Sequence, residues 1–164
     1  MSASSYANLE SEKYQAHLDK LMEECDIGNS MTSMSLCSGQ GGDEIATKRL
    51  GMTCVLAAEI NRWARETCDK NGLYKGVMHT DFTRIAKDDL PYCNLLIAGL
   101  PCQSFSRGGL KNGFLDMRGS LFFFFWLILN WRRPEVAIIE NVDHLEVIDG
   151  GQTLKTMIEP CLSG

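Results

Sequence analysis

One cysteine and one glutamate each follow a short apolar run, and their side chains could act together on a single substrate. Cys102 lies in Gly-Leu-Pro-Cys-Gln-Ser-Phe-Ser, residues 99–106, just after the apolar run 94–98. A second apolar run, 136–139, ends in Glu140, 38 positions after Cys102. Open parallel sheets do their chemistry at the carboxyl ends of their strands. If the two runs are neighbouring strands, about 4.8 Å apart, the thiol and the carboxyl group can act on one small planar molecule.

A glycine-rich turn marks a second candidate site near the start of the domain. The first apolar run leads into Ser38, Gly39, Gln40, Gly41 and Gly42. Glycines at a strand-to-helix turn let a ligand approach the backbone closely. Glu59 stands 20 residues after Gly39, at the end of the second apolar run, where a carboxylate can accept hydrogen bonds from both ribose hydroxyls. The two features together predict a cofactor that contains adenosine.

The details of this turn favour S-adenosylmethionine over a nicotinamide dinucleotide. The dinucleotide pattern needs a third glycine where this chain has Glu44. A carboxylate at the start of a helix would oppose a pyrophosphate, whereas S-adenosylmethionine carries no phosphate. Asp81, after the third apolar run, is a candidate to bind the adenine amino group, or alternatively to cap a helix.

Apolar runs alternate with helical patterns along the chain, which predicts strands joined by helices. The expected strands are 34–37, 54–58, 76–79, 95–98 and 136–140, and the expected helices are 44–50, 61–70, 120–131 and 153–162. This order predicts an α/β fold with a doubly wound, mostly parallel, Rossmann-like sheet. We expect residues 1–30 to form a helical lead-in and residues 31–164 to form the domain. The phenylalanine-rich helix 120–131 is expected to be buried nearly all round.

The composition is that of one domain in a reducing compartment. The chain has 164 residues, a net charge of −5, seven cysteines without a Cys-x-x-Cys pair, and three histidines, so neither a disulfide framework nor a metal site is expected. No leader or membrane-spanning run is apparent, and we expect a cytoplasmic location without membrane contact. Between Cys102 and Arg133, five basic residues against one acidic residue could meet a polyanion, or form only a solvated basic face.

From about Ser33 onward the chain resembles the cytosine-C5 DNA methyltransferases. Six motifs occur in the family's order: the glycine turn, Glu59, Asp81-Phe82, Pro101-Cys102-Gln103, Asp116-Met117-Arg118-Gly119-Ser120-Leu121, and Glu140-Asn141-Val142. The resemblance implies that Cys102 attacks C6 of a cytosine flipped out of DNA, while Glu140 binds ring N3. It also implies an S-adenosylmethionine pocket formed by Cys37, Ser38, Gly39, Gln40, Gly41, Gly42, Glu59, Ile60, Asp81, Phe82, Pro101 and Leu121.

The chemistry of the residues agrees with these roles. A ring carbon such as C5 of cytosine becomes nucleophilic when a thiolate adds across the 5,6 bond. A free thiol with a pKa of about 8.5 is mostly protonated at pH 7, so Arg107 and the glycines after it are candidates to lower the pKa of Cys102. Three positions depart from the family pattern. Asn94 replaces a common aspartate, which is expected to matter little. Ser35 replaces an acidic residue, and Cys37 replaces a phenylalanine that usually packs on the adenine, which predicts weaker cofactor binding.

The family continues beyond the point that corresponds to Gly164. Two further strands, a motif whose arginine contacts the flipped base, and a target-recognition domain would follow. We therefore expect this chain to be either a truncated enzyme or one half of a split enzyme, inactive alone, with a second chain supplying the missing half in the latter case. The alternatives are a tRNA cytosine-C5 methyltransferase, a non-catalytic remnant that binds S-adenosylmethionine and, more remotely, a nicotinamide-dependent reductase.

Overall fold

The computed structural model of this protein describes residue 16 and residues 31–74, 76–101, 120–141 and 146–162. The strands are β1 (Thr32–Leu36), β2 (Thr53–Ala58), β3 (Val77–His79), β4 (Leu95–Gly99) and β5 (Val136–Glu140). The α-helices are α2 (Gly42–Arg49), α3 (Arg62–Lys70), α4 (Leu121–Arg132) and α5 (Gln152–Leu162). Short 3-10 turns occur at η1 (Phe82–Arg84), η2 (Lys87–Asp89) and η6 (Ile148–Gly151). The alternation predicted from the sequence is confirmed, with boundaries within about two residues. The predicted lead-in, apart from residue 16, lies outside the described residues.

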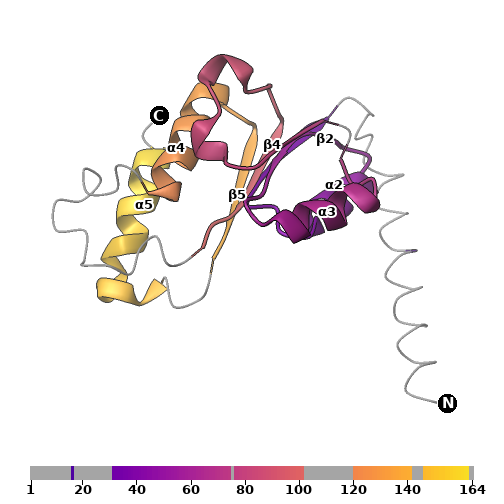
Figure 1. Cartoon of the computed structure of the whole chain (residues 1–164). Helices are drawn as coiled ribbons and strands as arrows, with labels where there is room; N and C mark the ends of the chain where they lie inside the picture. Colours follow the sequence, from indigo (N-terminus) through magenta and orange to yellow (C-terminus); the bar gives the residue numbers. More distant parts are fainter. Residues whose placement is uncertain (1–15, 17–30, 75, 102–119, 142–145, 163–164) are drawn as a thin grey trace, which may run out of the picture.

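All strand pairs are parallel, and the sheet order is β3-β2-β1-β4-β5. Helices α2 and α3 lie on one side of the sheet, and α4 and α5 lie on the other (Figure 1). The predicted doubly wound α/β fold is therefore confirmed. The chain reverses its direction of travel across the sheet between β1 and β4, and such a switch point opens a crevice at the carboxyl ends of the strands.

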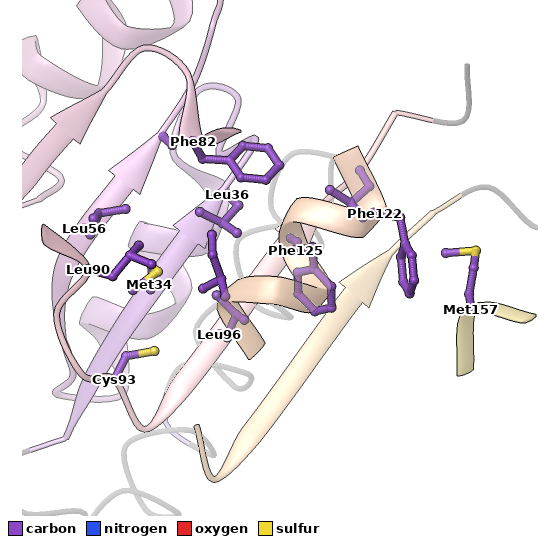
Figure 2. Packing of buried hydrophobic residues seen from close by; sticks show 14 residues of the cluster. Met34, Leu36, Leu56, Phe82, Leu90, Cys93, Leu96, Phe122, Phe125 and Met157 are labelled. Carbon is purple, nitrogen blue, oxygen red and sulfur yellow. The ribbon is translucent and has the colours of Figure 1, made fainter. Parts of the chain in front are cut away.

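The two faces of the sheet differ in the size of their side chains. The face under α4 carries the large core residues, including Met34, Leu36 and Leu96, which pack with Phe125 of α4 (Figure 2). The face under α2 has small polar side chains, and the hydroxyl of Ser35 donates to the Asp43 carboxylate at 3.0 Å. The central strands are buried on both faces, as is usual in parallel sheets.

Helix α4 is less buried than its sequence predicts. Only Phe122, Phe125 and Ile128 are fully buried, at the spacing of one helical face. The other described side chains of α4 are half-buried. The expectation of a helix buried nearly all round is therefore met only in part: complete burial is limited to one stripe, but no described side chain of α4 is exposed, and several of the half-buried ones pack against the core.

Candidate functional site

A pocket of about 310 Å³ opens at the carboxyl edge of the sheet, next to the switch point. Its walls are mostly apolar and include two carboxylates, a combination typical of small-molecule sites. The lining residues are Cys37, Ala58, Glu59, Ile60, Thr80, Asp81, Phe82, Gly99, Pro101 and Leu121. They come from the ends of four strands or the segments that follow them, and from the first turn of α4.

Most of the residues predicted to bind the cofactor therefore meet in one place. Those that line this pocket are Cys37, Glu59, Ile60, Asp81, Phe82, Pro101 and Leu121. The remaining predicted residues, Ser38, Gly39, Gln40, Gly41 and Gly42, form the adjoining turn and do not line it. Ala58, Thr80 and Gly99 also line the pocket and were not predicted from the sequence. The first two directly precede a predicted residue, and Gly99 directly follows the predicted strand 95–98, so their positions next to strand ends were the available signal.

The glycine turn has a backbone that demands glycine at Gly41. This residue has φ +89°, and a Cβ there would collide with the side chain of Leu73 and come within 3.0 Å of Cys68 Sγ. The Cys68 thiol also donates to the Gly39 carbonyl at 3.6 Å. Helix α3 therefore packs directly beneath the turn, which holds the turn in a fixed shape.

Two backbone N–H groups orient the Glu59 carboxylate. Gly39 N–H donates to Oε2 at 2.8 Å, and Asn61 N–H donates to Oε1 at 2.7 Å. A carboxylate oxygen can accept more than one hydrogen bond, so each oxygen keeps acceptor capacity. Glu59 thus joins the glycine turn to the pocket and still has the means to accept hydrogen bonds from a ribose.

Asp81 both caps a helix and lines the pocket. Its Oδ1 accepts from the Thr83 hydroxyl at 2.6 Å and from Thr83 N–H at 3.0 Å, at the start of η1. These hydrogen bonds, together with Arg84 at 3.2 Å from Oδ2, hold the pKa of Asp81 below its usual value. The helix-cap alternative is therefore present in the structure, and a contact with adenine would use the carboxylate while it is held in this position.

Cys37 stands between β1 and the glycine turn in an unusual conformation. Its φ of +56° lies in the left-handed region, which a residue with a side chain seldom adopts and which is typical of functional sites. Burial, with smaller effects of Glu59 and Asp81, raises the pKa of Cys37 to about 11. This thiol lines the pocket in its protonated form and is not a nucleophile at neutral pH.

Glu140 lies beside the pocket at the end of the neighbouring strand. It pairs with Gly99 in the register of β4 and β5, and its Oε2 would be 3.7 Å from a Cβ built on Gly99. The next residue, Asn141, donates from Nδ2 to the Leu100 carbonyl at 2.9 Å, which ties the end of β5 to the segment that leads toward Cys102. Cys102 itself lies outside the described residues.

The described residues fit S-adenosylmethionine in two respects. A Cβ added at Gly39 or Gly42 would meet no atom within 4 Å, so the turn leaves open space. The Ser38 hydroxyl is buried and has no hydrogen-bond partner among the described residues. In that same part of the chain, no group of three or more His, Cys, Asp or Glu side chains could hold a metal ion, and no helix has the length and apolarity to cross a membrane.

Two curated proteins of similar sequence are type II methyltransferases. A type II methyltransferase of Dactylococcopsis salina is 43% identical over 126 residues, which cover 76% of this chain and 35% of that protein. A type II methyltransferase of Haemophilus parahaemolyticus is 34% identical, covering 76% of this chain and 37% of that protein. The chain therefore spans about a third of the length of these curated relatives.

Solved structures share the fold. A Spodoptera frugiperda DNMT2 variant superposes with a TM-score of 0.59 at 21% identity, over 80% of this chain and 41% of that one. The Dnmt2 methyltransferase of S. pombe superposes with a TM-score of 0.53 at 22% identity, over 80% and 40% of the two chains. The family model for C-5 cytosine-specific DNA methylase matches residues 31–161, which is most of the domain. The chain belongs to the C-5 cytosine-specific DNA methylase family.

Proposed function

We propose that this chain provides the cofactor pocket and the reactive residues of a DNA cytosine-C5 methyltransferase. The observation that carries the proposal is the register of β4 and β5. It places Glu140 opposite Gly99, and Gly99 lines the pocket that Glu59 and Asp81 also line. A cofactor in this pocket and a cytosine bound at Glu140 would therefore be neighbours. S-adenosylmethionine would supply an electrophilic methyl group on a sulfonium sulfur.

The proposed chemistry divides between two side chains. The Cys102 thiolate adds to C6 of cytosine, while Glu140 binds N3 and stabilises the electron density that moves into the ring. S-adenosylmethionine held by Glu59 and Asp81 would supply the methyl group to C5, with its sulfur–methyl bond breaking and the electron pair of that bond remaining on sulfur. Loss of the C5 proton to a base expels the thiolate and restores the aromatic ring. The target atom is inaccessible inside a duplex, so the cytosine must first be flipped out of the DNA.

The site also predicts which part of the activity this chain can have on its own, since it covers only about a third of its relatives. The described residues of this chain already form the pocket, so we propose that the chain binds S-adenosylmethionine by itself. Recognition of a DNA sequence and turnover would require the part of the relatives that this chain does not cover, supplied by a continuation or a second chain. We place this activity in the cytoplasm.

Calorimetric titration of the 164-residue chain tests the proposed cofactor. We expect S-adenosylmethionine and its demethylated product, S-adenosylhomocysteine, to bind more tightly than NAD. Glu59→Ala should weaken the binding of both adenosyl ligands by about 1.5–3 kcal/mol, the usual value for hydrogen bonds to a charged group. Glu66→Ala removes a carboxylate that pairs on the surface with Arg62 and serves as the control. Tighter binding of NAD would refute the proposal.

A further inference from the structure

Gly99 lies between the cofactor pocket and Glu140, where the target cytosine is proposed to bind. It is the last residue of β4 and lines the pocket. The preceding residue, Ala98, pairs with Leu36 of β1, while Gly99 itself pairs with Glu140 of β5. Gly99 is therefore flanked by the peptide that follows β1 on one side and by the Glu140 carboxylate on the other.

The fold itself does not require glycine at this position. A Cβ built on Gly99 would lie 3.5 Å from the Cys37 carbonyl oxygen and 3.7 Å from Glu140 Oε2, both ordinary contact distances. Its backbone is not in the left-handed region, in contrast to Gly41. A glycine that neither strain nor packing explains, at the end of a strand, is typical of a place where a ligand approaches the backbone closely.

The strand order indicates which part of a ligand approaches it. Glu59 follows β2, and Glu140 ends β5, with β1 and β4 between these strands. A cofactor whose ribose is held at Glu59 must extend toward β4 for its methyl group to approach a base held at Glu140. The residue at the end of β4 is Gly99.

We propose that Gly99 determines the size of the group that is transferred, because its missing side chain leaves room for a methyl group between the cofactor sulfur and the base. This inference rests on the proposed function. In the transfer, the bond from sulfur to the methyl carbon breaks, its electron pair remains on sulfur, and the methyl carbon bonds to C5. A side chain at position 99 would enter the space of the migrating group.

The test compares three ligands that differ only at the sulfur: S-adenosylhomocysteine without an alkyl group, S-adenosylmethionine with methyl, and S-adenosylethionine with ethyl. Their dissociation constants are measured by calorimetry for the wild-type chain, Gly99→Ala and Gly99→Ser. We expect Gly99→Ala to change the dissociation constant of S-adenosylhomocysteine by no more than about twofold. The same variant should raise the dissociation constant of S-adenosylmethionine about tenfold, which is the size of a typical overpacking effect. The ethyl compound should lose more affinity than either. The serine variant should show the same order.

Gly42→Ala is the matched control, since it adds the same methyl group in open space within the cofactor turn. It should change all three affinities by the same factor. If Gly99→Ala and Gly99→Ser weaken the three ligands equally, or if both variants lose cooperative thermal unfolding, the role of Gly99 is refuted while the proposed function stands. If the wild-type chain binds none of the three ligands, the proposed function itself is refuted.

Discussion

At the scale of single residues, the described cysteines are poor nucleophiles. Burial raises the pKa of Cys54 to about 12 and that of Cys93 to about 11, and the pKa values of Cys68 and Cys161 are raised for the same reason. A reactive cysteine requires the opposite shift. The described residues therefore contain no other candidate for the nucleophile. Cys102, by contrast, lies in a basic stretch of the sequence.

Covalent trapping tests Cys102 as the nucleophile. In a chimera, this chain is joined to the part of the Dactylococcopsis salina enzyme that follows the matched region. We expect the chimera to form a stable adduct with DNA containing 5-fluorocytosine, because fluorine at C5 blocks the elimination that releases the thiol. Cys102→Ser should form no adduct, as read by denaturing electrophoresis. Cys37→Ser is the control and should still form the adduct. An adduct that survives Cys102→Ser and disappears in Cys37→Ser would identify the other sulfur.

Glu44 has an unusual environment for a carboxyl group. Its side chain is 1% exposed, neither carboxyl oxygen has a hydrogen-bond partner among the described residues, and it lines a second pocket of about 400 Å³ with Lys48. Burial, reinforced by the neighbouring Asp43, raises the pKa of Glu44. Cys54, Cys68 and Tyr74 lie close enough for its charge to raise their own pKa values. The folded chain thus favours the protonated form of Glu44 more strongly than the unfolded chain does.

This shift predicts a pH dependence of stability with a definite sign. Between the unfolded pKa of about 4.3 and the raised folded value, the native state holds a proton that the unfolded state releases. The contribution of Glu44 to stability is therefore fully present below the unfolded pKa and declines as the pH rises. Glu44→Gln cannot ionise, so we expect it to exceed the wild type by about 1–3 kcal/mol at pH 8 and by less at pH 5.

Thermal unfolding of the wild type, Glu44→Gln and the control Glu66→Gln between pH 5 and pH 8 measures this difference. Glu66 forms a surface pair with Arg62 at 2.7 Å, and such pairs contribute little, about 0–1 kcal/mol. A stability difference between wild type and Glu44→Gln that does not change with pH would show that Glu44 ionises normally in the folded chain.

At the scale of elements, Asn141 joins the ends of β4 and β5. Its Nδ2 donates to the Leu100 carbonyl, directly before Pro101, which lines the cofactor pocket. We expect Asn141→Ala to lower the free energy of unfolding by about 0.5–1.5 kcal/mol. It should also weaken the binding of S-adenosylhomocysteine, because the pocket wall at Pro101 would be less firmly held. Thermal unfolding and calorimetry give the two values.

Asn71→Ala is the matched control for this prediction. Asn71 Nδ2 also donates to a backbone carbonyl, that of Thr67 at 2.7 Å, but at the exposed end of α3. Its loss should affect stability alone. Equal ligand affinities for Asn141→Ala and the wild type would mean that the link between the two strands does not support the pocket.

At the scale of the whole molecule, β5 leaves one edge of the described sheet open. All five of its residues are exposed, and Val136, Ile138 and Ile139 retain 53%, 48% and 38% of their surface. An open strand edge with apolar side chains favours pairing with another chain. We expect the purified 164-residue chain to associate as its concentration rises, as measured by light scattering, and Ile138→Lys to reduce this association.

The opposite edge of the sheet provides the control. Val77 of β3 is 59% exposed, and Val77→Lys adds the same charge there. Because β3 has only three residues, this variant should change association much less than Ile138→Lys. A wild-type chain that remains monomeric at high concentration and unfolds cooperatively would contradict the prediction.

The sequence by itself determined the elements and most of the pocket. Each predicted strand and helix of the domain is present, because the apolar runs and the helical periodicity are local properties of the chain. Glu59 and Asp81 could be assigned to one site because residues that follow parallel strands lie at the same edge of the sheet, whereas Cys37 and Pro101 were assigned to it from the family resemblance.

Only the tertiary structure decided how these parts face one another. The order β2-β1-β4-β5 places Gly99 between the pocket and Glu140, and nothing in the local sequence at residue 99 specifies its neighbours. Glu44 has the sequence position of an exposed helix-start carboxylate, yet packing of α2 against β1 and β2 buries it. The phenylalanine-rich sequence of α4 predicted more complete burial than the structure has. Strand order, register and burial depend on contacts between residues far apart in the chain, so they follow from the packing of the whole domain and not from any one segment.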